Sequence, residues 1–113
     1  MTEDTELFTK ERDRLQKLMM SKADRSMKRF LNLDSSVYDD GALDRKTKEM
    51  LGLVASTVLR CDDCIRYHLN TCFELGVKDE ELVETLDVAL VVGGSITIPH
   101  IRRAFDHWES MKN

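Results

Sequence analysis

Apolar side chains recur every three or four residues through most of this chain, the spacing that places them along one side of an α-helix. No segment keeps the strict alternation of apolar and polar residues that a half-buried strand requires. The pattern therefore predicts an all-α fold with about six helices. The expected helical ranges are 5–20, 23–31, 44–59, 61–76, 80–92 and a last helix that begins between residues 95 and 99.

The composition supports this fold class and sets the size of the protein. The sequence has 113 residues, so we expect one domain over residues 1–113 with a single core. One proline and five glycines are too few for a turn-rich sandwich or barrel. A net charge of −4 disfavours a nucleic-acid-binding module, which normally presents a basic patch. No apolar run approaches the roughly 18–20 residues that span a membrane.

Glycine, proline and acidic residues mark the expected helix ends. Residues 32–41 are rich in Asp and Ser and end in Gly, and we expect them to form the main loop. Gly76 suits the position just after a helix, Asp79 suits the next N-cap, and Pro99 fits a first turn. Side chains expected to face the interior include Met27, Phe30 and Leu31 in the second helix, Val83 in the fifth, and Phe105 in the last.

Nearly every residue from Met50 to Leu59 is apolar or small. A helix that is apolar on all sides lies at the centre of a core or in a subunit interface. Because one core of this size can hardly cover all of the apolar helix faces, we expect a homo-oligomer.

The N-terminal segment indicates the compartment. Residues 1–6 are mostly acidic or polar and lack the basic and apolar parts of a signal peptide. We therefore expect a cytoplasmic protein, in a reducing compartment where paired cysteines more often serve redox chemistry or metal binding than structural crosslinking.

The segment most informative about function runs from Cys61 through Cys64 to His68. On a helix, residues three and four apart lie on one face, so both thiols and the imidazole share a stripe. The predicted helix N-terminus favours the thiolate, which is the reactive form of cysteine, and His68 can accept the Cys64 proton. Once one thiol is oxidised, the other can close a disulfide if the first turn relaxes. The pattern is typical of a thiol redox site.

Charged residues around the two cysteines act in opposite directions. Asp62 and Asp63 disfavour a nearby thiolate by like-charge repulsion. We expect Arg60 and Arg66 to offset part of this repulsion.

Three other interpretations of the cysteines stay open. A zinc site would need further ligands such as His100 or His107, because Cys61 and Cys72 are about 16 Å apart along a helix. The pair could instead be inert core thiols, since cysteine is often buried as a small apolar residue. A thioredoxin-like domain would require strands around the motif, and the sequence predicts none.

The remaining cysteine and histidines fit structural roles better. Cys72 lies among apolar residues far from the helix start, so we expect it in the core. His100 and His107 are seven residues apart on the last helix and share one face. We expect both at the surface or partly packed.

Glu49 begins the apolar part of the third helix. If the third and fourth helices form an antiparallel hairpin, Glu49 and His68 are offset by about five residues, or roughly 7–8 Å. A carboxylate near an imidazole fixes its tautomer and raises its basicity. The alternative is a surface Glu that pairs with Lys46 or Arg45.

These residues together resemble a known family. Glu49, the Cys61-x-x-Cys64 pair and His68 form the pattern E-x11-C-x-x-C-x3-H. This pattern is similar to that of the alkyl hydroperoxidase D-like proteins of the carboxymuconolactone decarboxylase family. The resemblance covers residues 40–92 well and the N-terminal helices loosely.

The resemblance implies an all-helical subunit that assembles into trimers or hexamers and acts as a dithiol peroxidase or disulfide reductase. It implies that Cys64 is the peroxidatic cysteine and Cys61 the resolving one. Glu49 and His68 would form a proton relay, through water, that activates Cys64. The implied substrate is a hydroperoxide, with no bound cofactor or metal. The implied reductant is an external dithiol, such as the lipoyl group on another protein that reduces the family's namesake.

One position departs from the family pattern, because the namesake has a His directly before the second cysteine and this chain has Asp63. A thiol oxidoreductase other than a peroxidase therefore fits as well. Lactone decarboxylation, the other activity of the family, would need a proton donor and a carboxylate-binding cation rather than two thiols. A non-enzymatic helical oligomer that senses redox state is the third alternative.

Overall fold

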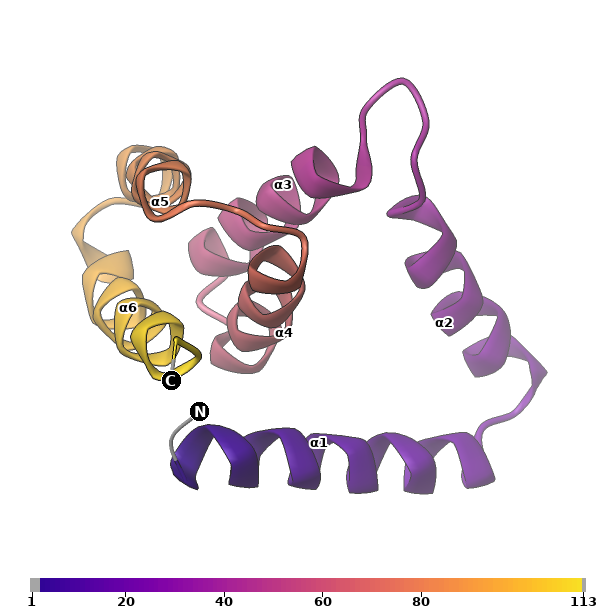
Figure 1. Ribbon diagram of the computed structural model, residues 1–113. Helices are drawn as coiled ribbons and strands as arrows, with labels where there is room; N and C mark the ends of the chain where they lie inside the picture. Colours follow the sequence, from indigo (N-terminus) through magenta and orange to yellow (C-terminus); the bar gives the residue numbers. More distant parts are fainter. Residues whose placement is uncertain (1–2, 113) are drawn as a thin grey trace.

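The computed structural model describes residues 3–112 and is all-α, as the sequence predicts, with no strand in this part of the chain. Residues 3–112 form six α-helices, labelled in Figure 1, and one short 3-10 helix, η1. The elements are α1 (Glu3–Lys22), α2 (Arg25–Val37), α3 (Arg45–Val58), α4 (Asp62–Glu74), α5 (Asp79–Gly93), η1 (Ser95–Thr97) and α6 (Ile98–Ser110). None of these helices is long and apolar enough to cross a membrane.

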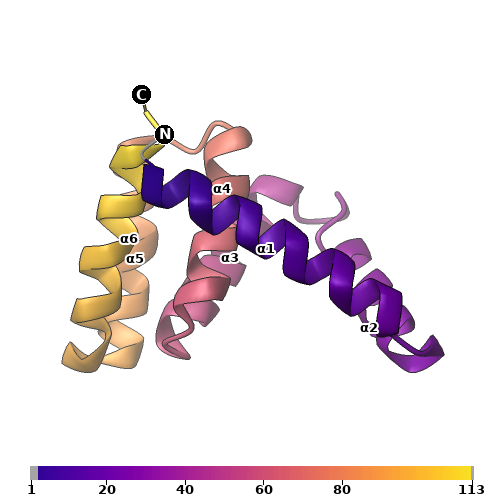
Figure 2. The same cartoon turned by 90° about the horizontal axis from the view of Figure 1, so that it is seen from below.

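Helices α3 to α6 form the core of the molecule. Helix α3 packs against α4 and α5, and α4 packs against α6. The hairpin of α3 and α4 therefore lies beside the pair α5 and α6 (Figure 2). Trp108 is a central member of the core. Its ring meets Phe73 edge to face, and its Nε1–H donates to Asp79 Oδ1 at 2.8 Å. The largest buried apolar side chains are Leu53, Ile65, Leu69, Leu82, Leu86 and Trp108.

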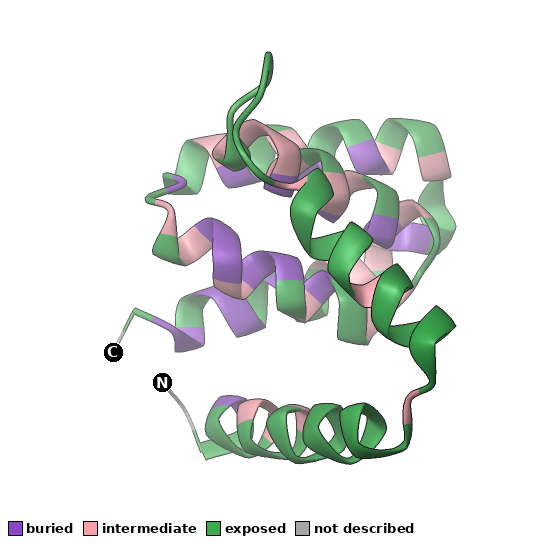
Figure 3. Cartoon of the chain, turned by 90° about the vertical axis from the view of Figure 1, so that its right-hand side faces the viewer, coloured by how far each residue is buried: buried purple, intermediate pink, exposed green. Residues whose placement is uncertain are grey.

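Helices α1 and α2 form an arm that extends away from this core (Figures 1 and 3). The start of α1 is attached to α4 and α6. There the Thr5 and Ser110 hydroxyls are hydrogen-bonded at 2.6 Å, Phe8 meets the His107 ring edge on, and Arg66 lies over Phe8. This contact buries His107, which sequence reasoning wrongly expected at the surface or only partly packed. Burial lowers the pKa of His107 to about 4, with Arg66 adding to the effect, so the ring is neutral at physiological pH.

The expected loop over residues 32–41 is wrong at its start, because α2 continues to Val37. Ser36 lies in this helix, and its hydroxyl donates to the carbonyl of Leu33. The turn occupies residues 38–44, where the Lys48 ammonium binds the carbonyls of Val37 and Asp39. The short polar side chains of this segment are therefore compatible with a helix.

Several side chains expected in the interior are exposed. Met27 is 51% exposed and Phe30 is 67% exposed, because α2 lies in the arm rather than on the core. Val83 and Phe105 also keep more than a third of their surface in solvent. Helical spacing identified which residues share a face, but it could not tell whether the chain itself covers that face.

The N-cap of α5 lies one residue earlier than expected. Lys78 is the N-cap, and its N–H donates to Glu81 Oε1 at 2.9 Å. Asp79 is instead the first helical residue, and its carboxylate binds Trp108 and Lys112.

Helices α3 and α4 end in the same way. At the end of α3, Cys61 N–H binds the Ser56 carbonyl and Arg60 N–H binds the Thr57 carbonyl. This Schellman arrangement needs a left-handed residue, and Arg60 supplies it with φ 60°. At the end of α4 the left-handed residue is Gly76, with φ 81°, as its position in the sequence predicts.

We predict that Arg60→Gly stabilises the protein and that Gly76→Ala destabilises it, each by about 1 kcal/mol or less. A left-handed backbone is strained for Arg and free for Gly, and a Cβ at Gly76 would meet no atom within 4 Å, which leaves only the backbone effect. Urea unfolding of the disulfide-bonded protein measures both changes. A destabilised Arg60→Gly variant would contradict the left-handed conformation of Arg60.

Candidate active site

The two motif cysteines lie at the start of α4, where the chain leaves the turn after α3. Cys61 is the N-cap of α4, and a disulfide joins it to Cys64 with a Cα–Cα distance of 5.3 Å. The Cys64 N–H donates to Cys61 Sγ at 3.2 Å. The first N–H groups of a helix lack partners inside it and favour a negative charge, so this position suits a thiolate.

The two acidic residues between the cysteines are both paired with side chains from other helices. Asp63 lies 3.8 Å from Arg12 of α1, and Asp62 binds His100 and Arg103 of α6. No such contact comes from Arg60 or Arg66 within residues 3–112. Arginines on two distant helices therefore offset the negative charge beside the thiols.

Glu49 and His68 form a buried pair across the interface of α3 and α4. His68 Nδ1 lies 2.7 Å from Glu49 Oε1, and the two residues are 8% and 2% exposed. The two side chains contact each other directly. An ionised carboxylate can only accept a hydrogen bond, so in the tautomer that donates Nδ1–H to Glu49 the Nε2 atom is the acceptor.

Gly52 makes this direct contact possible. It lies three residues after Glu49, on the same face of α3, and the His68 ring passes over it. A Cβ at Gly52 would lie 2.7 Å from His68 Cε1 and 2.8 Å from the Tyr38 hydroxyl. With no side chain in the way, the imidazole approaches the helix backbone closely enough for Nδ1 to reach Glu49.

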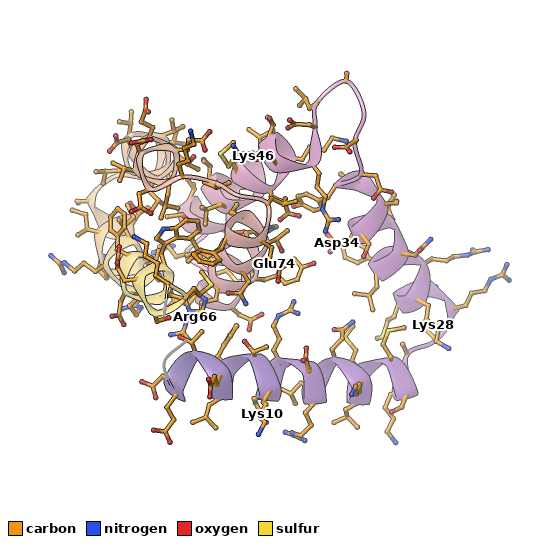
Figure 4. The ribbon with its side chains drawn as sticks, in the orientation of Figure 1. Lys10, Lys28, Asp34, Lys46, Arg66 and Glu74 are labelled. Atoms are coloured by element: carbon orange, nitrogen blue, oxygen red, sulfur yellow. A yellow bond between two sulfur atoms is a disulfide. The ribbon has the colours of Figure 1, made fainter. Side chains whose placement is uncertain are left out.

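A cleft of about 400 Å³ opens onto Cys64 and His68. It lies between the arm and the core, and Figure 4 shows Asp34 on the side of α2 that faces α3 and α4. Cys64 is exposed to solvent and Cys61 is half-buried. The lining residues are Arg12, Gln16, Leu31, Asp34, Ser35, Ser56, Asp63, Cys64, Tyr67 and His68.

Cys72 is fully buried in the core, as the sequence predicts, and forms no disulfide. Burial raises the pKa of its thiol to about 12, and the Glu49 charge adds to the effect. The thiol is therefore protonated and unreactive at neutral pH. Among residues 3–112, no three His, Cys, Asp or Glu side chains are arranged to hold a metal ion.

Two further side chains at the site were missed by sequence reasoning. Tyr38 lies beside His68, with ring centroids 5.5 Å apart, and burial together with the Glu49 carboxylate raises its pKa. The Arg12 guanidinium lies 4.3 Å from the centre of the Tyr67 ring. No motif marks either residue, because each reaches the site only through the folding of the arm.

The sequence of the chain matches a known protein family. Residues 24–107 match the carboxymuconolactone decarboxylase family. The chain belongs to this family. A curated relative, "Uncharacterized protein 4 in cox locus" of Paracoccus denitrificans, is 31% identical over 75 residues, which is 66% of this chain and 68% of that protein.

Solved structures of two family members share the fold closely. TM1620 from Thermotoga maritima is 58% identical, with a TM-score of 0.91 over 93% of this chain and 92% of that one. With a second solved structure, TM1620 is described as a carboxymuconolactone decarboxylase family protein possibly involved in antioxidative response. Apo-lpg0406 from Legionella pneumophila is 28% identical, with a TM-score of 0.90 over 99% of this chain and 100% of that one.

We predict that Gly52→Ala destabilises the protein by about 1–3 kcal/mol, since the new methyl group must displace the His68 ring or Tyr38. The Nδ1–H signal of His68 in nitrogen–proton spectra should be lost or shifted with its hydrogen bond. Gly41→Ala is the matched control, because a Cβ there meets only Lys48 Nζ at 3.6 Å. Equal stability of the two variants would show that the ring does not lie over Gly52.

Proposed function

We propose that this member of the carboxymuconolactone decarboxylase family is a dithiol oxidoreductase that reduces hydroperoxides. The observation that carries the proposal is the placement of Cys64. This exposed cysteine is paired with Cys61 at a helix N-terminus and shares a cleft with His68, which is bonded to the buried Glu49. The description of TM1620 as a possible participant in the antioxidative response also supports it.

The reaction begins with the reduced protein. His68 takes the Cys64 proton at Nε2, since Nδ1 is occupied by Glu49. The thiolate attacks the terminal oxygen of the hydroperoxide, so that an S–O bond forms and the O–O bond breaks. The alkoxide takes the proton back from His68 and leaves as an alcohol, and Cys64 becomes a sulfenic acid. Glu49 stabilises the imidazolium while the proton is held.

Cys61 completes the oxidative half of the cycle. Its sulfur attacks the sulfenic acid of Cys64, the S–O bond breaks, water leaves, and the disulfide forms. The Cα–Cα distance of 5.3 Å suits this bond. An external dithiol, such as a lipoyl group on another protein, then exchanges with Cys61 and leaves as a disulfide, which returns both cysteines to thiols.

We predict that the reduced protein consumes an alkyl hydroperoxide when dihydrolipoamide or dithiothreitol is supplied, and that Cys64→Ser abolishes this activity. With the external dithiol removed after reduction, Cys61→Ser should react once per subunit and then accumulate a sulfenic acid, since neither a neighbouring thiol nor an added one resolves it. Cys72→Ser is the control and should retain activity, because that thiol stays buried and protonated. Activity that survives Cys64→Ser would overturn the proposal.

We also propose that the protein assembles with copies of itself into a trimer or hexamer. The arm carries a row of apolar side chains on each helix that nothing in the described chain covers, and α5 adds more near its end. A monomer rarely exposes apolar patches beyond a few hundred Å². The most exposed of these residues are Leu7, Leu15, Leu18, Met27, Phe30, Leu33, Val37, Val88, Val91 and Val92.

Light scattering at micromolar concentration should report at least three times the subunit mass of 13.1 kDa. Phe30→Glu, which places a charge in the apolar row of α2, should weaken the assembly, whereas Lys28→Glu on the same helix should not. A 13.1 kDa species in the wild type would rule out the assembly.

A further inference from the structure

Asp62 lies between the two cysteines, and α6 holds its carboxylate from two residues. His100 Nδ1 is 2.8 Å from Asp62 Oδ1, and Arg103 Nε and Nη2 are both 3.1 Å from Oδ2. The carboxylate has no proton to give, so Nδ1–H of His100 is the donor. Arg103 Nη2 also lies 3.2 Å from that same Nδ1, a contact between two donors rather than a hydrogen bond. The three side chains form one cluster, named here the α6 clamp.

The clamp keeps Asp62 charged and neutralises that charge. Burial works against ionisation, but the hydrogen bonds from His100 and Arg103 outweigh it and hold the pKa of Asp62 below its usual value. The other acid beside the thiols, Asp63, has its own partner in Arg12 on α1. Each carboxylate inside the motif therefore has a matched cation.

We propose that His100 and Arg103 are positioning residues that set the reduction potential of the Cys61–Cys64 pair by neutralising Asp62. The proposal rests on the proposed dithiol function and concerns the ease of reducing the disulfide. A carboxylate without the Arg103 cation and the His100 hydrogen bond repels the thiolate that reduction creates. The clamp removes this repulsion, stabilises the reduced form, and so raises the potential, since a stabilised reduced form makes a stronger oxidant.

This charge balance gives opposite effects for opposite substitutions. Arg103→Gln leaves Asp62 under-compensated, so the disulfide becomes harder to reduce. Asp62→Asn removes the repulsion but keeps the cation, so the disulfide becomes easier to reduce. In the double variant Asp62→Asn with Arg103→Gln, neither charge is present, and the reduction potential returns toward that of the wild type. A clamp that merely joined α4 to α6 would produce no such reversal.

The test equilibrates each variant with dithiothreitol redox buffers and traps free thiols to measure the fraction of disulfide. We expect Arg103→Gln to favour the disulfide about tenfold, which is about 30 mV toward more negative potential for two electrons, and His100→Gln to act in the same direction. Asp62→Asn should move the potential the opposite way. Arg102→Gln, at the exposed neighbouring position, is the matched control and should match the wild type.

The proposal is overturned if Arg103→Gln and His100→Gln match Arg102→Gln, or if Asp62→Asn moves the potential in the same direction as Arg103→Gln. Should Arg103→Gln fail to fold, His100→Gln and Asp62→Asn still give the two opposite directions. The assay contains no hydroperoxide. An inactive peroxidase with a shifted potential would therefore refute the proposed substrate and leave the clamp intact.

Discussion

The buried hydrogen bond between Glu49 and His68 is the contact on which the arrangement of the site depends. It joins α3 to α4, the two helices that carry the motif. A carboxylate and an imidazole away from water are costly unless they are paired, so this bond constrains how the two helices pack against each other. The same bond occupies Nδ1 and leaves Nε2 for chemistry. In the proposed mechanism, the interaction that satisfies these buried groups therefore also orients His68 as the base.

The turn between these helices places the cysteines relative to that base. Arg60 in a left-handed conformation closes α3, and the next residue, Cys61, already caps α4. The thiols consequently lie at the positive end of a helix, with Cys64 one turn before His68. Charges from distant helices complete the environment, because Arg12 of α1 and Arg103 of α6 pair with the two acids between the cysteines. The motif lies on α3 and α4, but the charges around it thus also depend on α1 and α6.

Local signals in the sequence predicted the parts of the structure that local physics determines. Helical spacing gave α3 to α6 to within about two residues, the usual uncertainty of a helix end, and Gly76 marked a left-handed helix end correctly. The spacing of Glu49, Cys64 and His68 predicted a shared site. It left a gap of several ångströms between Glu49 and His68, because it could not show that the ring would lie over Gly52.

The remaining errors involve contacts between distant segments. His107 is buried because the start of α1 packs over it. Phe30 is exposed because α2 does not pack on the core. Asp79 is not an N-cap, and its carboxylate instead accepts a hydrogen bond from Trp108, twenty-nine residues later. Neither His100 nor Arg12 shows in the sequence that it will face an acid beside the thiols. Such pairings follow from the packing of whole helices and leave no local pattern.

The central claim is that Glu49, through His68, activates Cys64. Its most direct test is the rate at which iodoacetamide alkylates Cys64 from pH 5 to 10 in a reduced protein whose other two cysteines are Ser. Near neutral pH we expect Glu49→Gln and His68→Asn to react about 10²–10⁴ times more slowly, with rates that approach the parent's at high pH, where the thiolate forms unaided. Glu81→Gln, which removes a carboxylate paired with Lys46 of α3, should behave like the parent. Equal rates for all four proteins at neutral pH would contradict the account.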